Sequence, residues 1–322
     1  MNDSTKKYLN LVDRIDEYIN DMNISLEYIQ QFRTLVKSAR QIVVTGTGTS
    51  FPTAQYLAAR LQDIYSSQSV RFLPTAKAIR AAGCADKKDL FIVISYGLNR
   101  ADSLIILEKA GSVCKTISIS GNANAALVNN LNIVIPPEEE KFFCRPVSPL
   151  TTLVAINMLC GSDSVSAPTA LDVKLLSDWI DPIKQTIILY AADISYSAEL
   201  WGIVLREGAG MNVSIKDMEN YSHGYYGPDT THLNDRQYII MKSDSNEDTR
   251  DYGRAKGLYG TRGFNKFVVE AKGGVAVANQ TLFRTVPNLI GNLLIRTGYD
   301  MYGPNGMEEN RRYHEYEHYT NY

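Results

Sequence analysis

Glycines and hydroxyl side chains follow a short β-branched run near residue 45, a combination that can hold a phosphate. The run Ile42–Val44 leads into Thr45–Ser50, and a helix-like pattern continues over Ala54–Ile64. Glycine lets the backbone approach a ligand closely, and the first N–H groups of a helix have no partner within it. The pattern therefore predicts a strand, a tight loop and a helix N-terminus that can bind an anion. A loop that only caps the helix is the alternative.

Two well-known phosphate-binding motifs do not describe this loop. No Gly-Lys-Ser/Thr follows it, so it is not a P-loop, and Phe51 stands where a dinucleotide fingerprint needs a small third residue. The candidate ligand residues of this segment are Gly48, Thr49 and Ser50.

Two later strands also end in polar residues. Leu90–Ser95 and Thr116–Ser120 are apolar runs that finish with a hydroxyl side chain. Ligands of open parallel sheets bind at the carboxyl ends of the strands, so we expect these loops to meet at one edge. Arg145 precedes a predicted helix start, where it either meets an anion or lies on the surface. The further candidates for ligand binding are Ser95, Tyr96, Gly97, Asn99, Arg100, Ser120, Arg145 and Ser148.

Strand and helix patterns alternate along the chain, which predicts an α/β fold with parallel strands. The first series covers residues 42–135 and is preceded by a helical pattern over 4–38. Residues 161–168 are a linker candidate, and a second series begins with a strand at 186–190. The later predicted elements are helix 149–160, helix 197–207, strand 238–242, helix 247–258, strand 266–270 and helix 286–301.

Composition and charge are those of an ordinary globular chain. Of 322 residues, 44% are hydrophobic and 21% charged, and the net charge is −2, so no electrostatic feature favours nucleic acid or an anionic membrane. The first residues lack the apolar core of a signal peptide, and no apolar run reaches the roughly 20 residues of a membrane span. The four cysteines are widely spaced. We therefore expect a cytoplasmic protein with free thiols.

The loops resemble those of the SIS (sugar isomerase) superfamily of phosphosugar-binding domains. Its first loop reads Gly-Thr-Ser, matched by Gly48–Ser50, and its second reads Ser-x-Ser-Gly-x-Thr, where this chain has Ser95–Arg100. The first Ser matches, but Gly97 replaces the second Ser and Arg100 replaces the Thr. Two hydroxyl donors are thus lost, and a guanidinium able to make charge-assisted bonds to phosphate is gained.

The second half is similar to the isomerase half of glucosamine-6-phosphate synthases. The segment with Glu207 matches Glu-Gly-Ala, and the segment up to Pro228 is similar to a Glu-x-Tyr strand followed by a His-Gly-Pro motif. The resemblance places a Lys and a Glu four and seven residues after the first Glu, and a His before Gly-Pro. Here these positions are Met211, Ser214 and Tyr226.

Another proton-transfer group must therefore replace the missing ones if the chain is an enzyme, because enolisation of a sugar needs a base. The candidates for this base are His223, Glu219 and Glu207. Of these, His223 ranks first and Glu219 second, and Asp217 lies nearby in the sequence. On a strand, Asp217 and Glu219 would share one face. The alternative is that the carboxylates lie on the surface and that the histidine has only a structural role.

The C-terminal segment resembles the tails of fructosamine-6-phosphate deglycases, which the superfamily uses to cover the ligand cleft. His314 and His318 share a helix spacing, yet no further ligand set accompanies them, so we expect no metal.

The resemblance implies two tandem SIS-type αβα units, each a mainly parallel sheet flanked by helices. We expect residues 1–165 to hold an N-terminal helix and the first domain, and residues 166–322 the second domain and the tail. The implied function is a cofactor-independent isomerase, deglycase or aminosugar-forming enzyme acting on a phosphorylated sugar or amino sugar, in a homodimer with a shared cleft. The alternatives are a non-catalytic sugar-phosphate-binding protein and an enzyme acting on another anionic carbohydrate derivative, such as a nucleotide sugar.

Overall fold

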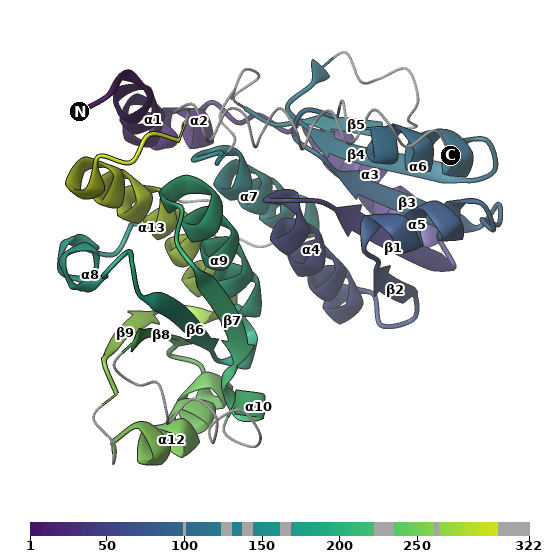
Figure 1. Ribbon diagram of the computed structural model, residues 1–322. Helices are drawn as coiled ribbons and strands as arrows, with labels where there is room; N and C mark the ends of the chain where they lie inside the picture. The colour runs from purple at the N-terminus through teal and green to yellow at the C-terminus, as the bar shows by residue number, and fades with distance from the viewer. Residues whose placement is uncertain are drawn as a thin grey trace. The chain divides into compact units, whose positions relative to one another are not determined.

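The chain forms two compact units, each a sheet between layers of helices (Figure 1). The N-terminal unit is Arg14–Ala167, and the C-terminal unit joins Met1–Asp13 to Pro168–Tyr322. The computed structural model describes residues 1–98, 101–123, 131–136, 144–161, 169–221, 235–260 and 264–301. The expected α/β class with two mainly parallel sheets is confirmed.

The sheet of the N-terminal unit has five parallel strands in the order β2-β1-β3-β4-β5. Every residue of the central strand β3 is buried, as expected for a parallel sheet with helices on both faces. The strands are β1 (Gln41–Gly46), β2 (Ser69–Phe72), β3 (Asp89–Ile94), β4 (Lys115–Ser120) and β5 (Leu131–Val134).

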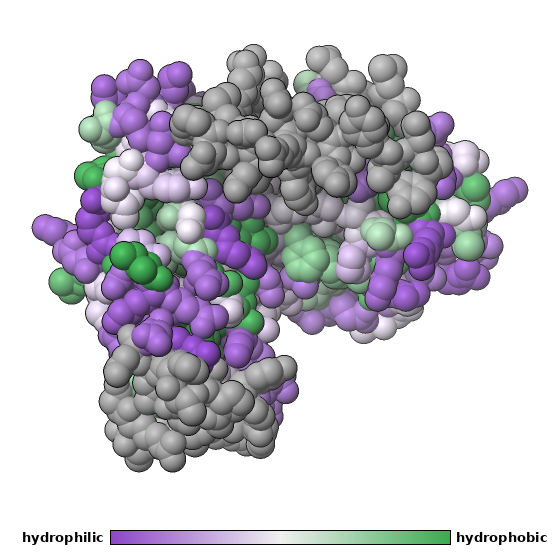
Figure 2. Space-filling view, in the orientation of Figure 1, coloured by the Kyte–Doolittle hydropathy of each residue, from purple (hydrophilic) through white to green (hydrophobic). Residues whose placement is uncertain are grey.

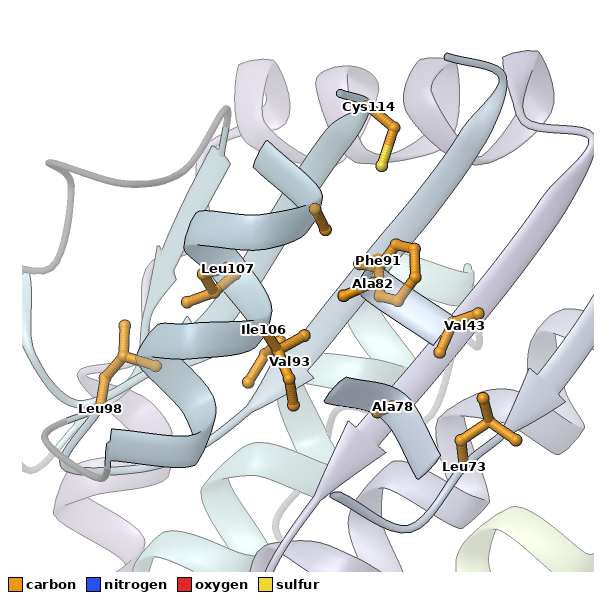
Figure 3. Packing of buried hydrophobic residues seen from close by; sticks show 11 residues of the cluster. Val43, Leu73, Ala78, Ala82, Phe91, Val93, Leu98, Ile106, Leu107 and Cys114 are labelled. Atoms are coloured by element: carbon orange, nitrogen blue, oxygen red, sulfur yellow. The ribbon is translucent and has the colours of Figure 1, made fainter. Parts of the chain in front are cut away.

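Helices cover both faces of this sheet. One layer contains α3 (Leu26–Ser38), α4 (Ser50–Ile64) and α7 (Ser148–Cys160), with α2 (Ile15–Asn20) against α7. The other contains α5 (Thr75–Ala82) and α6 (Ala101–Gly111). Val43 of β1 and Phe91 and Val93 of β3 point into this second layer and form a buried cluster with residues of α5 and α6, namely Ala78, Ala82, Ile106 and Leu107 (Figure 3). The core thus fixes the strand ends from which the loops start.

The C-terminal unit repeats this plan with four parallel strands in the order β7-β6-β8-β9. They are β6 (Gln185–Tyr190), β7 (Val213–Asp217), β8 (Arg236–Ser243) and β9 (Lys266–Ala271). The long helices α9 (Ser195–Ala209) and α13 (Gly274–Thr297) pack against each other, and α8 (Lys174–Trp179) lies on α13. The 3-10 turn η2 (Ala192–Ile194) leads into α9, and α10 (Met218–Asn220) and α12 (Asn246–Gly260) pack together.

The N-terminal segment differs from the single helical stretch expected over residues 4–38. It is broken into α1 (Asp3–Asp13), α2 and α3, and α1 packs on α13 of the C-terminal unit rather than joining the first domain. Two contacts explain this placement. A Cβ on Gly291 would lie 2.6 Å from Leu9 Cδ2, so the glycine makes room for α1, and Ser4 Oγ donates to Asp300 Oδ1 at 2.7 Å.

The last helix also differs from the expectation. It starts at Gly274 rather than at 286 and carries Pro287 in its interior. Its middle residues are buried along nearly the whole circumference, so a one-sided apolar pattern could not mark its start. Within the described part of the chain, no helix is long and apolar enough to cross a membrane. Figure 2 shows apolar residues scattered among hydrophilic ones on the described surface in that view.

Candidate functional site

The N-terminal sheet has one edge where its topology creates a binding position. In the order β2-β1-β3-β4-β5, the chain leaves β1 toward β2 on one side and returns to β3 on the other. Ligands of such sheets bind at the carboxyl ends of the strands, where the strand order reverses. We call this end of the sheet the carboxyl edge. It carries the β1 loop (Thr47–Thr49), the β3 loop (Ser95–Leu98) and the β4 loop (Gly121–Ala123).

Two glycines shape the β1 loop for different reasons. A Cβ on Gly46 would lie 2.5 Å from the backbone oxygen of Ser50 and 3.1 Å from Ala54 Cβ, so only glycine lets α4 start this close to β1. Gly48 has open space around it but a φ of +57°, a left-handed conformation that glycine adopts without steric cost.

The N-terminus of α4 does not offer the set of free N–H groups expected from the sequence. The N–H of Ser50 donates to Thr47 O at 3.1 Å, and that of Phe51 donates to Gly48 O at 3.0 Å. The next residue, Pro52, has no N–H to donate. The side chains of Thr49 and Ser50 are half-buried, and Thr49 does not cap the helix. Any anion at this loop must therefore depend on hydroxyl groups more than on the helix backbone.

The β3 loop begins with two buried residues and contains a strained one. Ser95 and Tyr96 are 7% and 6% exposed. Leu98 has a φ of +41°, and it is the one non-glycine residue with positive φ in the described part of the chain. Leu98 occupies the Gly position of the Ser-x-Ser-Gly-x-Thr motif, so the loop keeps a glycine-like backbone with a leucine in it. A left-handed conformation costs a residue with a Cβ about 1–2 kcal/mol.

Leu98 tolerates this conformation because its side chain is an integral part of the core. It is 3% exposed and packs in the cluster that includes Val93 and Ile106 (Figure 3). Strained residues persist where surrounding contacts fix them, and they concentrate at functional sites.

Tyr96 joins the β3 loop to the β4 loop and to the approach to α7. A Cβ on Gly121 would lie 2.6 Å from the Tyr96 ring, so the ring packs directly on the glycine backbone. The guanidinium carbon of Arg145 lies 4.5 Å from the centroid of the same ring, within the range of a cation–π contact. Arg145 is thereby held beside the β3 loop, as a ligand-facing role would require.

Ser120 and Ser148 are more enclosed than the sequence suggested. Ser120 is fully buried, and its single hydroxyl proton is shared between two acceptors, Asn132 Oδ1 at 3.2 Å and Asn122 O at 3.3 Å. Ser148 is 3% exposed at the first position of α7. The geometry gives the Ser120 hydroxyl a structural role, because both of its bonds hold neighbouring backbone and strand residues.

The C-terminal unit separates two of the candidate bases. Glu207 lies on the last turn of α9, just before the turn into β7, whereas Glu219 follows the far end of β7. The strand between them has five residues and spans about 16 Å, so the two glutamates lie at opposite ends of β7. Within this unit they cannot act on the same ligand atom.

The segment after β7 is not the expected strand. Asp217 ends β7, and its carboxylate caps α10 by accepting from the N–H of Asn220 at 2.8 Å. Glu219 lies within α10 and is exposed. The expectation that Asp217 and Glu219 share one face of a strand is therefore wrong, because the helix cap turns the chain after residue 217.

Met211 and Ser214 have no role that would replace a lysine or a glutamate. Met211 is 3% exposed, and the hydroxyl of Ser214 accepts from Gln185 Nε2 at 3.3 Å on β7. Both positions lie beyond the end of α9 at Ala209. A count that starts at Glu207 therefore leaves the helix before it reaches these positions.

One titratable group at the carboxyl edge of the second sheet was missed by the sequence reasoning. Glu199 on α9 is half-buried, and burial raises its carboxyl pKa while Arg206 opposes the rise. Burial also raises the pKa of Tyr190, and so do the charges of Asp217 and Glu199. A glutamate near the start of an amphipathic helix is an ordinary surface pattern, so no signal in the sequence distinguished Glu199.

Several expected site residues lie outside the described residues, namely Asn99, Arg100, His223 and Tyr226. The two C-terminal histidines, His314 and His318, do as well. Among the residues that the structure describes, no group of three or more His, Cys, Asp or Glu side chains could hold a metal ion.

Residues 35–160 match the family model of the SIS domain. In sequence, no curated protein matches the chain. Among solved structures, a Silicibacter pomeroyi DSS-3 protein assigned as a phosphosugar isomerase is 13% identical at a TM-score of 0.76, with 91% of this chain and 99% of that chain covered. The C-terminal domain of glucosamine-fructose-6-phosphate aminotransferase from Francisella tularensis is 15% identical at a TM-score of 0.72 (92% and 96% covered). Tagatose-6-phosphate ketose/aldose isomerase from Escherichia coli is 14% identical at a TM-score of 0.70 (91% and 92%). At these identities the likeness establishes the fold.

Proposed function

We propose that this chain, whose residues 35–160 match the SIS domain family, binds a phosphorylated sugar or amino sugar and converts it by enolisation of the open-chain form. The observation that carries the proposal is the carboxyl edge of the matched domain. There, the hydroxyls of Thr49 and Ser50 follow β1, and Ser95 follows the adjacent strand β3. Neutral hydroxyl donors on neighbouring strand ends suit the oxygens of a phosphate.

The phosphate pocket is tested by removing two hydroxyls together. Ser50→Ala with Ser95→Ala should weaken glucosamine 6-phosphate or fructose 6-phosphate by about 1–3 kcal/mol, the range for hydrogen bonds to a charged group. Binding is measured by calorimetric titration. The matched control replaces Ser67 and Ser112, two exposed serines of the same unit that lie away from the carboxyl edge. Equal affinity of the edge variant and the control would exclude this pocket.

For the base, the described residues favour Glu207 over Glu219. Glu207 is half-buried, whereas Glu219 is exposed. A base shielded from water transfers protons more selectively than a fully hydrated one. His223 remains a candidate from the sequence, because an unperturbed histidine titrates near neutrality.

The chemistry is tested by exchange of the sugar proton beside the carbonyl in D₂O. Glu207→Gln should slow the exchange about 10²–10⁴-fold, the usual contribution of a general base, while Glu219→Gln should leave it unchanged. His223→Asn decides whether the histidine takes part. Wild-type exchange that survives both Glu207→Gln and His223→Asn would refute the assignment of the base.

A second candidate function is sugar-phosphate binding without catalysis. It is favoured by Met211 and Ser214, since these two side chains stand in for the Lys and Glu of the related synthases and neither can accept the proton. Tight binding of a sugar phosphate without any proton exchange would select this function. A homodimer and a contribution of Arg100 to phosphate binding remain predictions; Arg100→Thr, which restores the hydroxyl of the family motif, tests the latter by the same titration.

A further inference from the structure

A chain of polar contacts runs from strand β5 to the β3 loop. At its start, Asn132 Oδ1 accepts from the hydroxyls of Ser118 at 2.6 Å and Ser120 at 3.2 Å. Its amide Nδ2 donates to Asn122 O at 3.1 Å. The backbone N–H of Asn122 in turn donates to Ser120 Oγ at 3.2 Å. These bonds lock the β4 loop onto the two strands beneath it.

Asn122 also reaches across to the β3 loop, which contains the strained residue Leu98. Asn122 Nδ2 donates to Gly97 O at 3.3 Å, one residue before Leu98. The N–H of Gly121 donates to Tyr96 O at 2.8 Å, and the N–H of Leu98 closes the loop by donating to Ser95 O at 3.1 Å. The Gly97 carbonyl is thus fixed from the β4 side, and the carbonyl of Tyr96 is fixed beside it.

We propose that Asn122 is a positioning residue that holds the β3 loop in its strained conformation, so that Ser95 presents its hydroxyl to the phosphate. The proposal rests on the proposed sugar-phosphate site. A left-handed Leu98 is unfavourable by itself, so contacts on both sides of it must over-determine its backbone. Its buried side chain supplies one such contact, and the amide of Asn122 supplies the other.

Asn132 acts one step further away. Its amide Nδ2 fixes the backbone of Asn122 by donating to the Asn122 carbonyl. A hydrogen-bonded chain of this kind is stronger when every member is satisfied, and the loss of one member loosens the next.

The test compares Asn122→Ala and Asn122→Asp with Asn122→Gln. Alanine removes the donor, and aspartate keeps the shape but presents an acceptor to the Gly97 carbonyl, whereas glutamine keeps an amide donor. The matched control is Asn288→Ala, because Asn288 Nδ2 also donates to a backbone carbonyl, that of Arg284, at 3.3 Å. The control therefore removes the same kind of bond from helix α13.

The first readout is hydrogen exchange of the Leu98 and Gly121 amides. Alanine and aspartate at position 122 should speed this exchange at least tenfold, glutamine should restore part of the protection, and the control should not change it. The second readout is the affinity for glucosamine 6-phosphate, which we expect to fall about tenfold in the alanine and aspartate variants.

Unchanged exchange at Leu98 and Gly121 in both the alanine and aspartate variants would overturn the proposal, and so would faster exchange with full sugar-phosphate affinity. If the wild type binds no sugar phosphate, the proposed function fails, while the exchange measurement still decides whether Asn122 holds the loop.

Discussion

Because the backbone of Leu98 is left-handed, we expect glycine to destabilise the protein less than alanine does at this position. Leu98→Ala and Leu98→Gly both remove a fully buried side chain, and each should destabilise the protein by about 2–5 kcal/mol. The two variants differ mainly in their backbone preferences. Their difference in free energy of unfolding therefore isolates the strain of the φ angle, which is +41°.

The size of this difference follows from two opposing effects. A residue with a Cβ loses about 1–2 kcal/mol in the left-handed region, and glycine avoids this cost. Glycine in turn gives the unfolded chain more freedom, which disfavours folding by about 0.5–1 kcal/mol. Leu98→Gly should therefore be more stable than Leu98→Ala by about 0.5–1 kcal/mol.

Leu107 provides the matched control within the same buried cluster. It is 0% exposed and lies in helix α6, where alanine is favoured over glycine by about 1 kcal/mol. The order of the two variants should therefore be reversed between positions 98 and 107.

The assay is thermal or urea unfolding of the four variants at one protein concentration. For a unit of this size, 1 kcal/mol corresponds to about 2–4 °C in melting temperature, so the reversal is measurable. If Leu98→Ala is more stable than Leu98→Gly by the same margin as at position 107, the loop is unstrained and the reasoning fails.

Other consequences of the structure can be checked in the same way. Gly46→Ala should destabilise the N-terminal unit by about 1–3 kcal/mol, because its Cβ would overlap the Ser50 carbonyl; urea unfolding that matches wild type would contradict the close packing. Gly291→Ala should destabilise the C-terminal unit through the clash with Leu9, and Leu9→Ala should relieve part of that loss in a double-mutant cycle. Burial raises the pKa of Glu199, so the unfolded carboxyl ionises at lower pH than the folded one, and stability falls as pH rises through the folded pKa. Glu199→Gln should therefore be more stable than wild type at pH 7, with no difference below the unfolded pKa of about 4.3, as measured by denaturation across pH.

Much of the fold could be predicted from the sequence because the strands of a parallel sheet are continuous apolar runs. The strands beginning near residues 42, 90, 116, 186, 238 and 266 all form, within one or two residues of their expected bounds. The residues of the short strand β2 alternate between exposed and partly buried, and no apolar run predicts this strand. The helix α5 that follows it is only eight residues long.

The site was less predictable, because it depends on contacts between loops. The motifs at residues 48–50 and 95–100 predict ligand-binding groups after the strands that end at Gly46 and Ile94. They could not show that the N–H groups at the start of α4 are already used by the β1 loop, or that the hydroxyl of Ser120 is turned inward to Asn132. A hydrogen bond between a strand end and a neighbouring strand, such as that from Ser120 to Asn132, leaves no local pattern in a sequence.

The sequence alone thus determined the class of each segment and the family resemblance, since both depend on local periodicity and on short motifs. Only the tertiary structure decided that α1 packs on α13, that Glu207 and Glu219 lie at opposite ends of β7, and that Leu98 takes a glycine-like backbone. Each of these outcomes is set by which surfaces meet after the chain has folded: a glycine opposite a leucine, a strand between two carboxylates, and a buried side chain that offsets the cost of a strained φ.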